Sequence, residues 1–156
     1  MKLSFLWIGR TRDRRVAEMI DEYAGRIRRY CRVEITELRE APHDAKRSPR
    51  ERNEREGAKI LKALKPGTFR VAFDERGREM TSEGFAVFLG RVVEGTPAGV
   101  TMILGGPYGL SEAVLEAAGQ RLALSRMTLT HEMARLVALD QVYRAFTILR
   151  GESYHH

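Results

Sequence analysis

Short apolar segments alternate with amphipathic ones along the chain, and this alternation constrains the fold more than any other feature. The apolar segments predict five strands, at residues 3–8, 33–38, 69–73, 100–104 and 122–124. Helical spacing of apolar residues, or a capping serine or threonine, predicts five helices between and after them. These helices span about 16–30, 48–64, 81–95, 111–118 and 130–150. Strands interleaved with helices are typical of an α/β fold with a mostly parallel sheet and helices on both of its faces.

The length and the composition favour one compact domain. The chain has 156 residues, of which 43% are apolar and 31% are charged. Domains usually contain roughly 100 to 200 residues, and this balance of apolar and charged residues supports a packed core. Because no repeat and no long linker divides the sequence, we expect a single domain over residues 1–156.

Cysteine usage and hydropathy exclude several classes of protein. Cys31 is the single cysteine, which rules out an internal disulfide framework and a zinc site made of cysteines alone. The apolar run at residues 3–8 is too short for the core of a signal peptide or for a membrane span. We therefore expect a cytoplasmic protein that does not contact a membrane.

Positive charge is concentrated in two places. The chain carries 27 basic and 21 acidic residues, for a net charge of +6. One cluster lies between residues 46 and 65 and contains Lys46, Arg47, Arg50, Arg52, Arg55, Lys59, Lys62 and Lys65. The other contains Arg10, Arg12, Arg14 and Arg15. Such clusters attract nucleic acid through its phosphates, although a solvated helix face with internal ion pairs has the same composition.

Candidate ligand-binding segments are the loops that follow three of the predicted strands. Ligands of open parallel sheets bind beyond the carboxyl ends of the strands, which here means the loops after Phe73, Leu104 and Leu124. The second loop, residues 105–109, reads GGPYG, and its glycines allow backbone N–H groups to approach a ligand. A tight turn that needs positive φ is the alternative. The loop lacks the dinucleotide-binding fingerprint and the P-loop lysine. After the predicted strand that ends at Phe73, residues 74–77 are expected to form a polar turn.

The last helix begins with HEMAR, which lacks the second histidine of a zinc protease motif because Arg135 occupies its position. We therefore expect no metal site, and we interpret His131 as a capping or structural residue. The same helix carries apolar residues on more than one face. A second copy of the chain is the expected cover, so we expect a homodimer; burial within one chain is the alternative.

Four segments in the second half of the chain together resemble one family. They read ILGGPYGLS at 103–111, LSRMTLTHEMAR at 124–135, DQVYRAF at 140–146 and RGESYHH at 150–156. Their order and spacing are similar to those of the SPOUT class of RNA methyltransferases, and within it to the bacterial RlmH family. The resemblance implies a deep trefoil knot in the C-terminal third. It also implies transfer of a methyl group from S-adenosyl-L-methionine to N3 of a pseudouridine in helix 69, a stem-loop of 23S ribosomal RNA, on the assembled ribosome.

The resemblance also implies which residues hold the cofactor, largely through backbone groups. Carried over by position, they are Phe73, Gly105, Leu124, Ser125, Arg126, Met127, Thr128 and Leu129. These residues belong to the three loops that the strand pattern brings to one edge of the sheet.

The resemblance further implies that the C-terminal tail completes the active site, across the interface of a homodimer. Removal of the proton from an imide nitrogen suits a base with a pKa near neutrality, and the unperturbed pKa of histidine is about 6.5. We therefore assign His155 as the base or its positioner. Tyr154 would stack on or hydrogen-bond to the target base, and Arg144 would contact a phosphate or a uracil carbonyl. Ser153 stands where many relatives have proline, which leaves the pose of the tail open. A frayed tail or a tag remnant is the alternative for 154–156.

Two other functions remain open at this stage. A SPOUT fold can serve as a non-catalytic RNA-binding or ribosome-assembly factor, or as an enzyme for another RNA such as transfer RNA. The chain has no spare segment for an appended RNA-binding domain, so recognition would come from the surface of the dimer and from a large structured substrate.

Overall fold

The computed structural model describes residues 1–42 and 46–155, with His155 described by its backbone alone. The strands are β1 (Lys2–Ile8), β2 (Arg32–Leu38), β3 (Phe69–Glu79), β4 (Val100–Leu104) and β5 (Gln120–Ala123). The helices are α1 (Arg14–Ile27), α2 (Pro49–Ala63), α3 (Ser82–Gly95), α4 (Glu112–Glu116) and α5 (His131–Arg150), followed by a 3-10 turn, η1 (Ser153–His155). The predicted order of strands and helices is confirmed.

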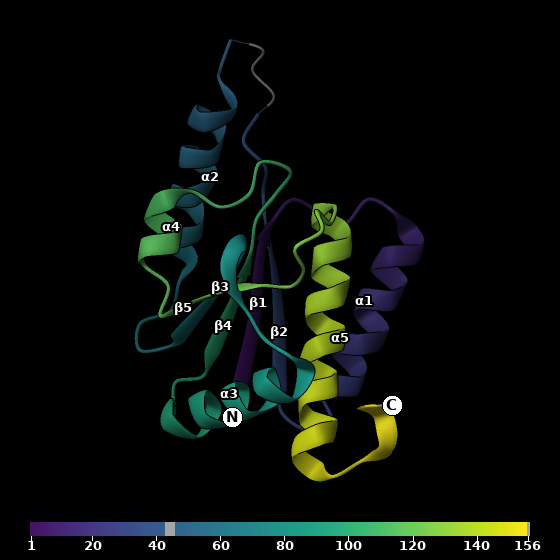
Figure 1. Ribbon diagram of the computed structural model, residues 1–156. Coiled ribbons are helices and arrows are strands. Elements are labelled where there is room, and N and C mark those ends of the chain that lie inside the picture. Colours follow the sequence, from purple (N-terminus) through teal and green to yellow (C-terminus); the bar gives the residue numbers. More distant parts are fainter. Residues whose placement is uncertain (43–45, 156) are drawn as a thin grey trace.

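The strands form a parallel sheet in the order β2-β1-β4-β3-β5 (Figure 1). The predicted α/β class is thereby confirmed. Because every pair is parallel, all carboxyl ends of the strands lie at one edge of the sheet. Phe73, in the middle of β3, pairs with Leu104 of β4 and Leu122 of β5, so the segments that follow β4 and β5 begin on either side of β3.

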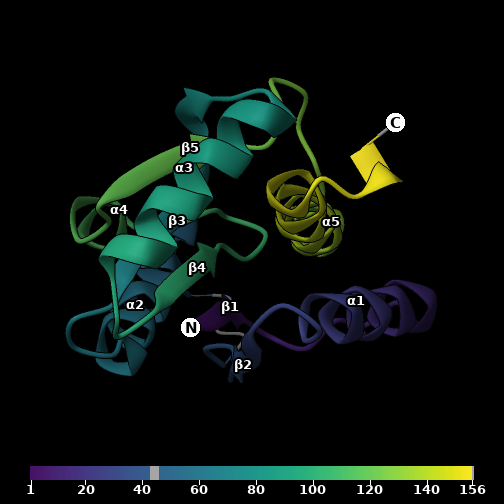
Figure 2. The ribbon, with the colours of Figure 1, turned by 90° about the horizontal axis from the view of Figure 1, so that it is seen from below.

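Side chains of β1 alternate between two apolar cores, one on each face of the sheet. Phe5 and Trp7 belong to the larger core, to which α1, α3 and α5 contribute. Leu6 and Ile8 belong to the smaller core, together with residues of α2 and α4. Figure 2 shows α1 and α5 on one side of the sheet and α2 and α4 on the other. The expectation of helices on both faces is correct, and the two layers are unequal in size.

The polar turn predicted at residues 74–77 is wrong, because β3 continues through it to Glu79. The pairing of β3 with β5 shifts register between Phe73 and Arg78, so the segment forms an irregularity within the strand. A Cβ at Gly77 would lie 2.5 Å from the carbonyl carbon of Leu122, which explains the glycine. Polar residues and a glycine are typical of turns, but a bulge near the edge of a sheet uses the same residue types.

The sequence S-P-R-E at residues 48–51 predicts a capping box, which is confirmed because Ser48 and Glu51 each bond to the backbone of the other at the start of α2. Ala58, Leu61 and Leu64 predict a thin apolar stripe on this helix. Leu61 and Leu64 do pack against the smaller core, beside the buried Gly57 and Ile60, whereas Ala58 is exposed. The helix has so few apolar residues that periodicity alone does not fix its orientation.

Glu34 on the edge strand β2 joins two lysines at the amino end of the sheet. Its carboxylate lies 2.7 Å from the ammonium group of Lys2 and 2.8 Å from that of Lys65. These contacts, first with Lys2 and then with Lys65, lower the pKa of Glu34 to about 2. The pair of contacts places an ion cluster on an exposed edge of the sheet.

Helix α5 is covered to a large extent within the chain, as the alternative interpretation of its apolar faces required. It packs against α1 and α3, and Leu139, Val142 and Phe146 are buried in the larger core. Met133 and Leu149 stay exposed. The homodimer stays a prediction. No helix among the described residues combines the length and the hydropathy needed to cross a bilayer.

Candidate active site

A cavity of about 800 Å³ lies at the carboxyl ends of β4 and β5, beside the middle of β3. The loops after Leu104 and Leu124 contribute to its wall, and so do residues 73–76 of β3, where a loop was expected. The lining residues are Phe73, Asp74, Glu75, Arg76, Gly105, Gly106, Pro107, Tyr108, Gly109, Leu110, Leu124, Ser125, Met127, Thr128, Leu129, Thr130, His131 and Ala134. Its size and its mixture of apolar and polar walls are those of a site for a small organic ligand.

The glycine loop at residues 105–110 forms one wall and folds back on itself. The N–H of Gly109 donates to the carbonyl oxygen of Gly106 at 3.0 Å, and Gly109 has a positive φ of 76°. A Cβ at Gly105 would lie 2.5 Å from the carbonyl carbon of Gly109. The alternative of a tight turn with positive φ is therefore confirmed at Gly109, and this turn lines the cavity. The approach of a ligand to its backbone stays a prediction.

The loop at residues 124–129 forms the opposite wall. The hydroxyl of Ser125 accepts a hydrogen bond from the N–H of Met127 at 2.9 Å, and the side chain of Met127 is 80% exposed. Arg126 is not among the lining residues, and its guanidinium donates to Glu79 at 2.8 Å. Seven of the eight predicted cofactor residues therefore line the cavity, and Arg126 alone of them turns its side chain elsewhere.

The start of α5 closes the cavity. Thr130 caps the helix, accepting a hydrogen bond from the N–H of Met133 at 3.3 Å. His131 follows it and lines the cavity. Burial, followed by the positive charge of Arg135, lowers the pKa of His131, which favours a neutral imidazole at neutral pH. No group of three or more candidate ligand residues that could hold a metal ion occurs among the described residues.

Arg135 joins the start of α5 to the end of β1. Its side chain is fully buried, with its guanidinium carbon 5.1 Å from the centre of the Trp7 ring. The guanidinium donates to the carbonyl oxygen of Ile8 at 2.6 Å and to the hydroxyl of Thr11 at 3.0 Å. The residue that replaces the second histidine of a zinc motif thus has a structural role beneath the cavity.

Tyr154 in η1 is anchored to the body of the protein. Its hydroxyl lies 2.9 Å from the hydroxyl of Tyr23 and donates to Asp140 at 2.9 Å. Burial, and then these hydrogen bonds, raise the pKa of Tyr154. Arg144 donates to the carbonyl oxygen of Tyr154 at 3.3 Å, with its guanidinium carbon 4.9 Å from the ring centre. The structure therefore brings Arg144 and Tyr154 together, while the side chain of His155 and all of His156 lie outside the described residues.

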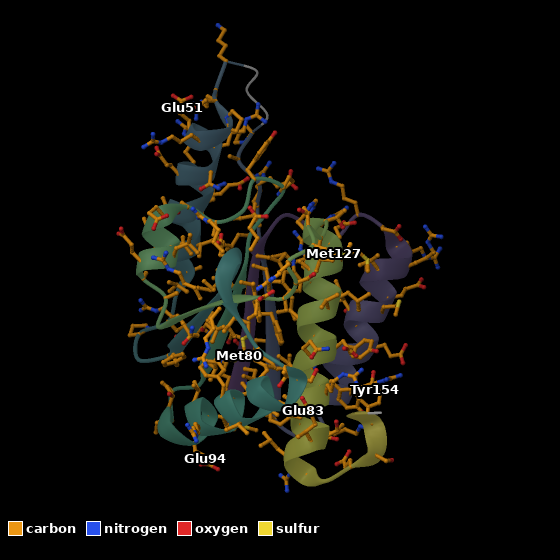
Figure 3. The ribbon with its side chains drawn as sticks, viewed as in Figure 1. Glu51, Met80, Glu83, Glu94, Met127 and Tyr154 are labelled. Carbon is orange, nitrogen blue, oxygen red and sulfur yellow. The ribbon has the colours of Figure 1, made fainter. Side chains whose placement is uncertain are left out.

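The tail and the cavity lie toward opposite ends of α5. His131 begins the helix at the cavity, and Arg144 stands 13 positions further along. At a rise of 1.5 Å per residue, this spacing separates them by about 20 Å. Figure 3 shows Met127 beside the first part of α5 and Tyr154 nearer its other end. Within one chain, the predicted catalytic residues Tyr154 and Arg144 therefore do not reach the predicted cofactor residues.

Both basic clusters contain ion pairs. Arg14 pairs with Glu18, and Arg50 pairs with Glu54 at 3.0 Å. These pairs agree with the interpretation as a solvated helix face. They do not remove the excess of positive charge, since basic residues outnumber acidic ones within residues 46–65.

Sequence reasoning missed several residues of the wall. Asp74, Glu75 and Arg76 follow Phe73 directly and line the cavity, but they were assigned to a turn. Asn53, on α2, donates to two carbonyl oxygens of the glycine loop. It is the chain's only asparagine, and asparagine is a weak helix former, so its place within a predicted helix was an available signal.

Comparisons with known proteins agree with this architecture. A family model described as predicted SPOUT methyltransferase matches residues 1–155. Two curated relatives are named ribosomal RNA large subunit methyltransferase H. The protein from Trichlorobacter lovleyi is 44% identical over 100% of both chains, and the one from Parabacteroides distasonis is 40% identical over 100% of this chain and 99% of its own.

Solved structures share the fold at low sequence identity. A transfer RNA (m1G37) methyltransferase from Aquifex aeolicus superposes with a TM-score of 0.54 at 15% identity, over 92% of this chain and 70% of its own. A probable ribosomal RNA methyltransferase from Porphyromonas gingivalis superposes with a TM-score of 0.56 at 17% identity, over 96% of this chain and 70% of its own. A putative methyltransferase from Legionella pneumophila, solved with its bound cofactor SAM, gives 0.52 at 13%, over 93% and 66%.

Proposed function

The chain belongs to the SPOUT methyltransferase family, and we propose that it methylates RNA of the large ribosomal subunit with S-adenosyl-L-methionine (SAM) as the methyl donor. The observation that carries the proposal is the cavity of about 800 Å³, which is lined by the three segments selected from the sequence after Phe73, Leu104 and Leu124. The names of relatives that align over the whole chain support the choice of ribosomal RNA. The structural neighbour with bound SAM supports the choice of cofactor.

The residues of the cavity fit this cofactor. A Cβ at Gly105 would meet the backbone of Gly109, so the loop folds back on itself only with glycine at this position. Gly105 and Gly106 line the cavity with backbone atoms alone. Phe73, Gly105 and the six residues 124–129 would hold the cofactor, with Arg126 acting through its backbone. When bound, the cofactor supplies an electrophilic methyl group on a sulfonium. The wall carries the carboxylates of Asp74 and Glu75 and the guanidinium of Arg76, which pairs with Asp74 at 3.2 Å. The excess of one negative charge suits a ligand that carries positive charge.

The proposed target is N3 of a pseudouridine in helix 69 of 23S ribosomal RNA, within the assembled ribosome. An imide nitrogen that carries a hydrogen has no free lone pair, so its proton must leave. His155 serves as the base or positions it, because the pKa of histidine is close to neutrality. Tyr154 offers a ring for stacking, and Arg144 offers a guanidinium for a phosphate or a carbonyl.

The active form is proposed to be a homodimer in which the tail of one copy reaches the cavity of the other. The separation of about 20 Å between His131 and Arg144 along α5 supports this arrangement, because a chain cannot bring its own Arg144 to its own cavity. Exposed methionines on the two adjacent helices, Met19 on α1 and Met133 on α5, offer apolar surface for the contact. The lysines and arginines of the two basic clusters, which are positively charged at neutral pH, would bind the phosphates of the RNA backbone.

A methyl-transfer assay on purified RNA particles tests the proposal. The protein is incubated with labelled SAM and with assembled ribosomes, separated subunits or transfer RNA from a strain that lacks the enzyme. Mass spectrometry then identifies the methylated nucleoside. We expect label in N3-methylpseudouridine of the large-subunit RNA, with assembled ribosomes as the best substrate.

Other results would assign the protein differently. Label in transfer RNA would keep the cofactor and change the substrate. SAM binding without transfer to any of these RNAs would refute the proposed substrates. Absence of SAM binding, measured by calorimetry, would favour a non-catalytic RNA-binding or ribosome-assembly factor.

A further inference from the structure

The glycine loop has little internal support. Its turn is closed by the bond from the Gly109 N–H to the Gly106 carbonyl. Pro107 has no N–H to donate, and the ring of Tyr108 is 50% exposed. A loop with three glycines among six residues has many conformations open to it. Its shape at the cavity therefore depends on contacts from outside the loop.

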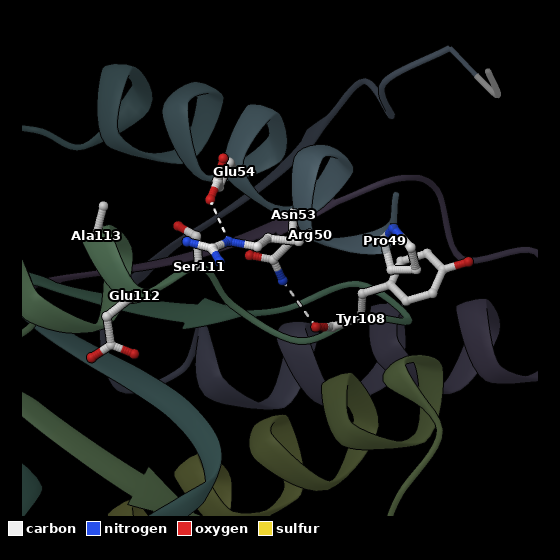
Figure 4. A pocket seen from close by; sticks show the side chains of 8 residues that line it. All are labelled: Pro49, Arg50, Asn53, Glu54, Tyr108, Ser111, Glu112 and Ala113. Carbon is white, nitrogen blue, oxygen red and sulfur yellow. Dashed lines mark hydrogen bonds and ion pairs between the residues drawn. The ribbon is translucent and has the colours of Figure 1, made fainter. Parts of the chain in front are cut away.

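Asn53 of α2 provides such a contact. Its side-chain amide donates to the carbonyl oxygen of Tyr108 at 2.9 Å and to that of Gly109 at 3.2 Å. Figure 4 shows Asn53 directed at Tyr108 from the helix above the loop. The amide nitrogen of one side chain thus donates to two consecutive carbonyls of the loop.

One helical turn after Asn53, α2 also lies close to the end of the glycine loop. A Cβ at Gly57 would lie 2.0 Å from the hydroxyl oxygen of Ser111, so the absence of a side chain lets α2 approach the start of α4. Positions 53 and 57 lie on one face of a helix because they are four residues apart. Around the same loop, the guanidinium carbon of Arg52 lies 5.9 Å from the centre of the Tyr108 ring. The loop is therefore braced by one face of a helix whose composition is otherwise that of an exposed element.

The two accepted bonds also orient the loop's donors. In a trans peptide, the N–H points away from the C=O that precedes it. Because the Gly109 carbonyl is directed at Asn53, the N–H of Leu110 is directed away from α2. Leu110 itself lines the cavity, as do Gly105 and Gly106. The Asn53 amide on α2 thus sets the direction of a backbone N–H group in the loop that lines the cavity.

We propose that Asn53 is a positioning residue that holds the glycine loop in its ligand-ready shape from the outer side of the cavity. This inference rests on the proposed function only in naming SAM as the ligand. Without Asn53, the loop must be ordered when the ligand binds, and that ordering weakens binding. The chemical step is not affected, because Asn53 is not among the lining residues of the cavity.

Asn53→Asp is the sharpest variant, because it keeps the shape of the side chain and removes both donors. Its matched control is Ala58→Asp, which adds the same charge to an exposed position of the same helix, five residues away. Asn53→Ala serves as a second variant if the aspartate destabilises the helix. Thermal melts of all three establish that each is folded.

Two measurements decide the proposal. Hydrogen exchange on the cofactor-free protein should be faster at residues 105–110 in Asn53→Asp than in the wild type or in Ala58→Asp. The Kd and KM for SAM should rise about tenfold, which corresponds to about 1.4 kcal/mol, while kcat at saturating SAM stays within about twofold. A generally destabilised protein would not separate KM from kcat in this way.

Unchanged exchange at residues 105–110 in both Asn53 variants would overturn the proposal, as would an unchanged Kd in a variant that is folded. If the wild type itself binds no SAM, the proposed function fails. The exchange measurement would still decide whether Asn53 orders the loop.

Discussion

Replacement of Arg135 by alanine tests the role of the buried guanidinium beneath the cavity. Truncation of a large buried side chain leaves a void that costs at least about 2 kcal/mol. The Ile8 carbonyl, which accepts from Arg135 at 2.6 Å, loses its partner in a buried place, at a cost of about 1–2 kcal/mol. Loss of the contact with the Trp7 ring adds about 1 kcal/mol.

Relief of a buried charge opposes these losses. Burial lowers the pKa of Arg135, which means that the folded protein opposes its positive charge. In addition, the Nε atom of Arg135 is buried without a hydrogen-bond partner among the described residues. We therefore expect a net loss of about 3 kcal/mol in the free energy of unfolding, which lowers Tm by roughly 6–12 °C in a chain of this size.

Denaturant and thermal unfolding at one fixed protein concentration measure this loss, since any dimer makes stability depend on concentration. Arg14→Ala is the control, because the Arg14 side chain is 91% exposed and, among the described residues, is paired with Glu18 of its own helix. The control should lose less than about 0.5 kcal/mol. A loss for Arg135→Ala no larger than that of the control would refute the argument that this guanidinium joins β1 to α5.

Three further predictions concern pH, the glycine loop and the tail. The pKa of Glu34 is lowered from an ordinary 4.5 to about 2, so its stabilising contribution is present above pH 5 and disappears toward pH 2; the Tm difference between wild type and Glu34→Gln should shrink over that range. Gly105→Ala should weaken SAM binding at least about tenfold because its Cβ would meet the backbone of Gly109. In the control Gly25→Ala, on α1, the added Cβ has no atom within 4 Å, so SAM binding should be normal and the free energy of unfolding should rise by up to about 1 kcal/mol. In a mixture of His155→Ala and Gly105→Ala chains, half of the dimers contain one chain of each kind. If each tail serves the partner's cavity, such a dimer has one complete site of two, formed by the cavity of the His155→Ala chain and the tail of the Gly105→Ala chain, so about a quarter of the wild-type activity should return. No recovery would show that each tail serves its own chain.

The location of the cavity could be predicted from the sequence because it follows from geometry. Once the strands are parallel, the residues that follow Phe73, Leu104 and Leu124 must lie close together on one side of the sheet, whether they form a loop or, as after Phe73, continue the strand. Their residue types then indicated a ligand, and the resemblance to a family indicated which one. The trefoil knot stays a prediction, because periodicity carries no information on how segments thread past one another.

Other features could not be predicted because the sequence pattern is ambiguous there. Residues 74–77 have the composition of a turn and form part of a strand, since a bulge and a turn need the same residue types. On α2, the covered face includes Gly57 and Asn53 beside the apolar Ile60, and the contacts of Gly57 and Asn53 leave no mark on an apolar pattern. The position of Tyr154 depends on bonds to Tyr23 and Asp140, which are distant in sequence.

The two walls of the cavity are supported by cores of different size. The start of α5 is tied to the larger core through Arg135, whereas the glycine loop leans on α2 and the short α4, which share the smaller core. Local opening requires the least free energy where the least apolar surface is buried. We therefore expect backbone amides of α2 and α4 to exchange with solvent faster than those of α5 and of the sheet. A ligand that contacts both walls of the cavity would slow exchange most in the layer of α2 and α4.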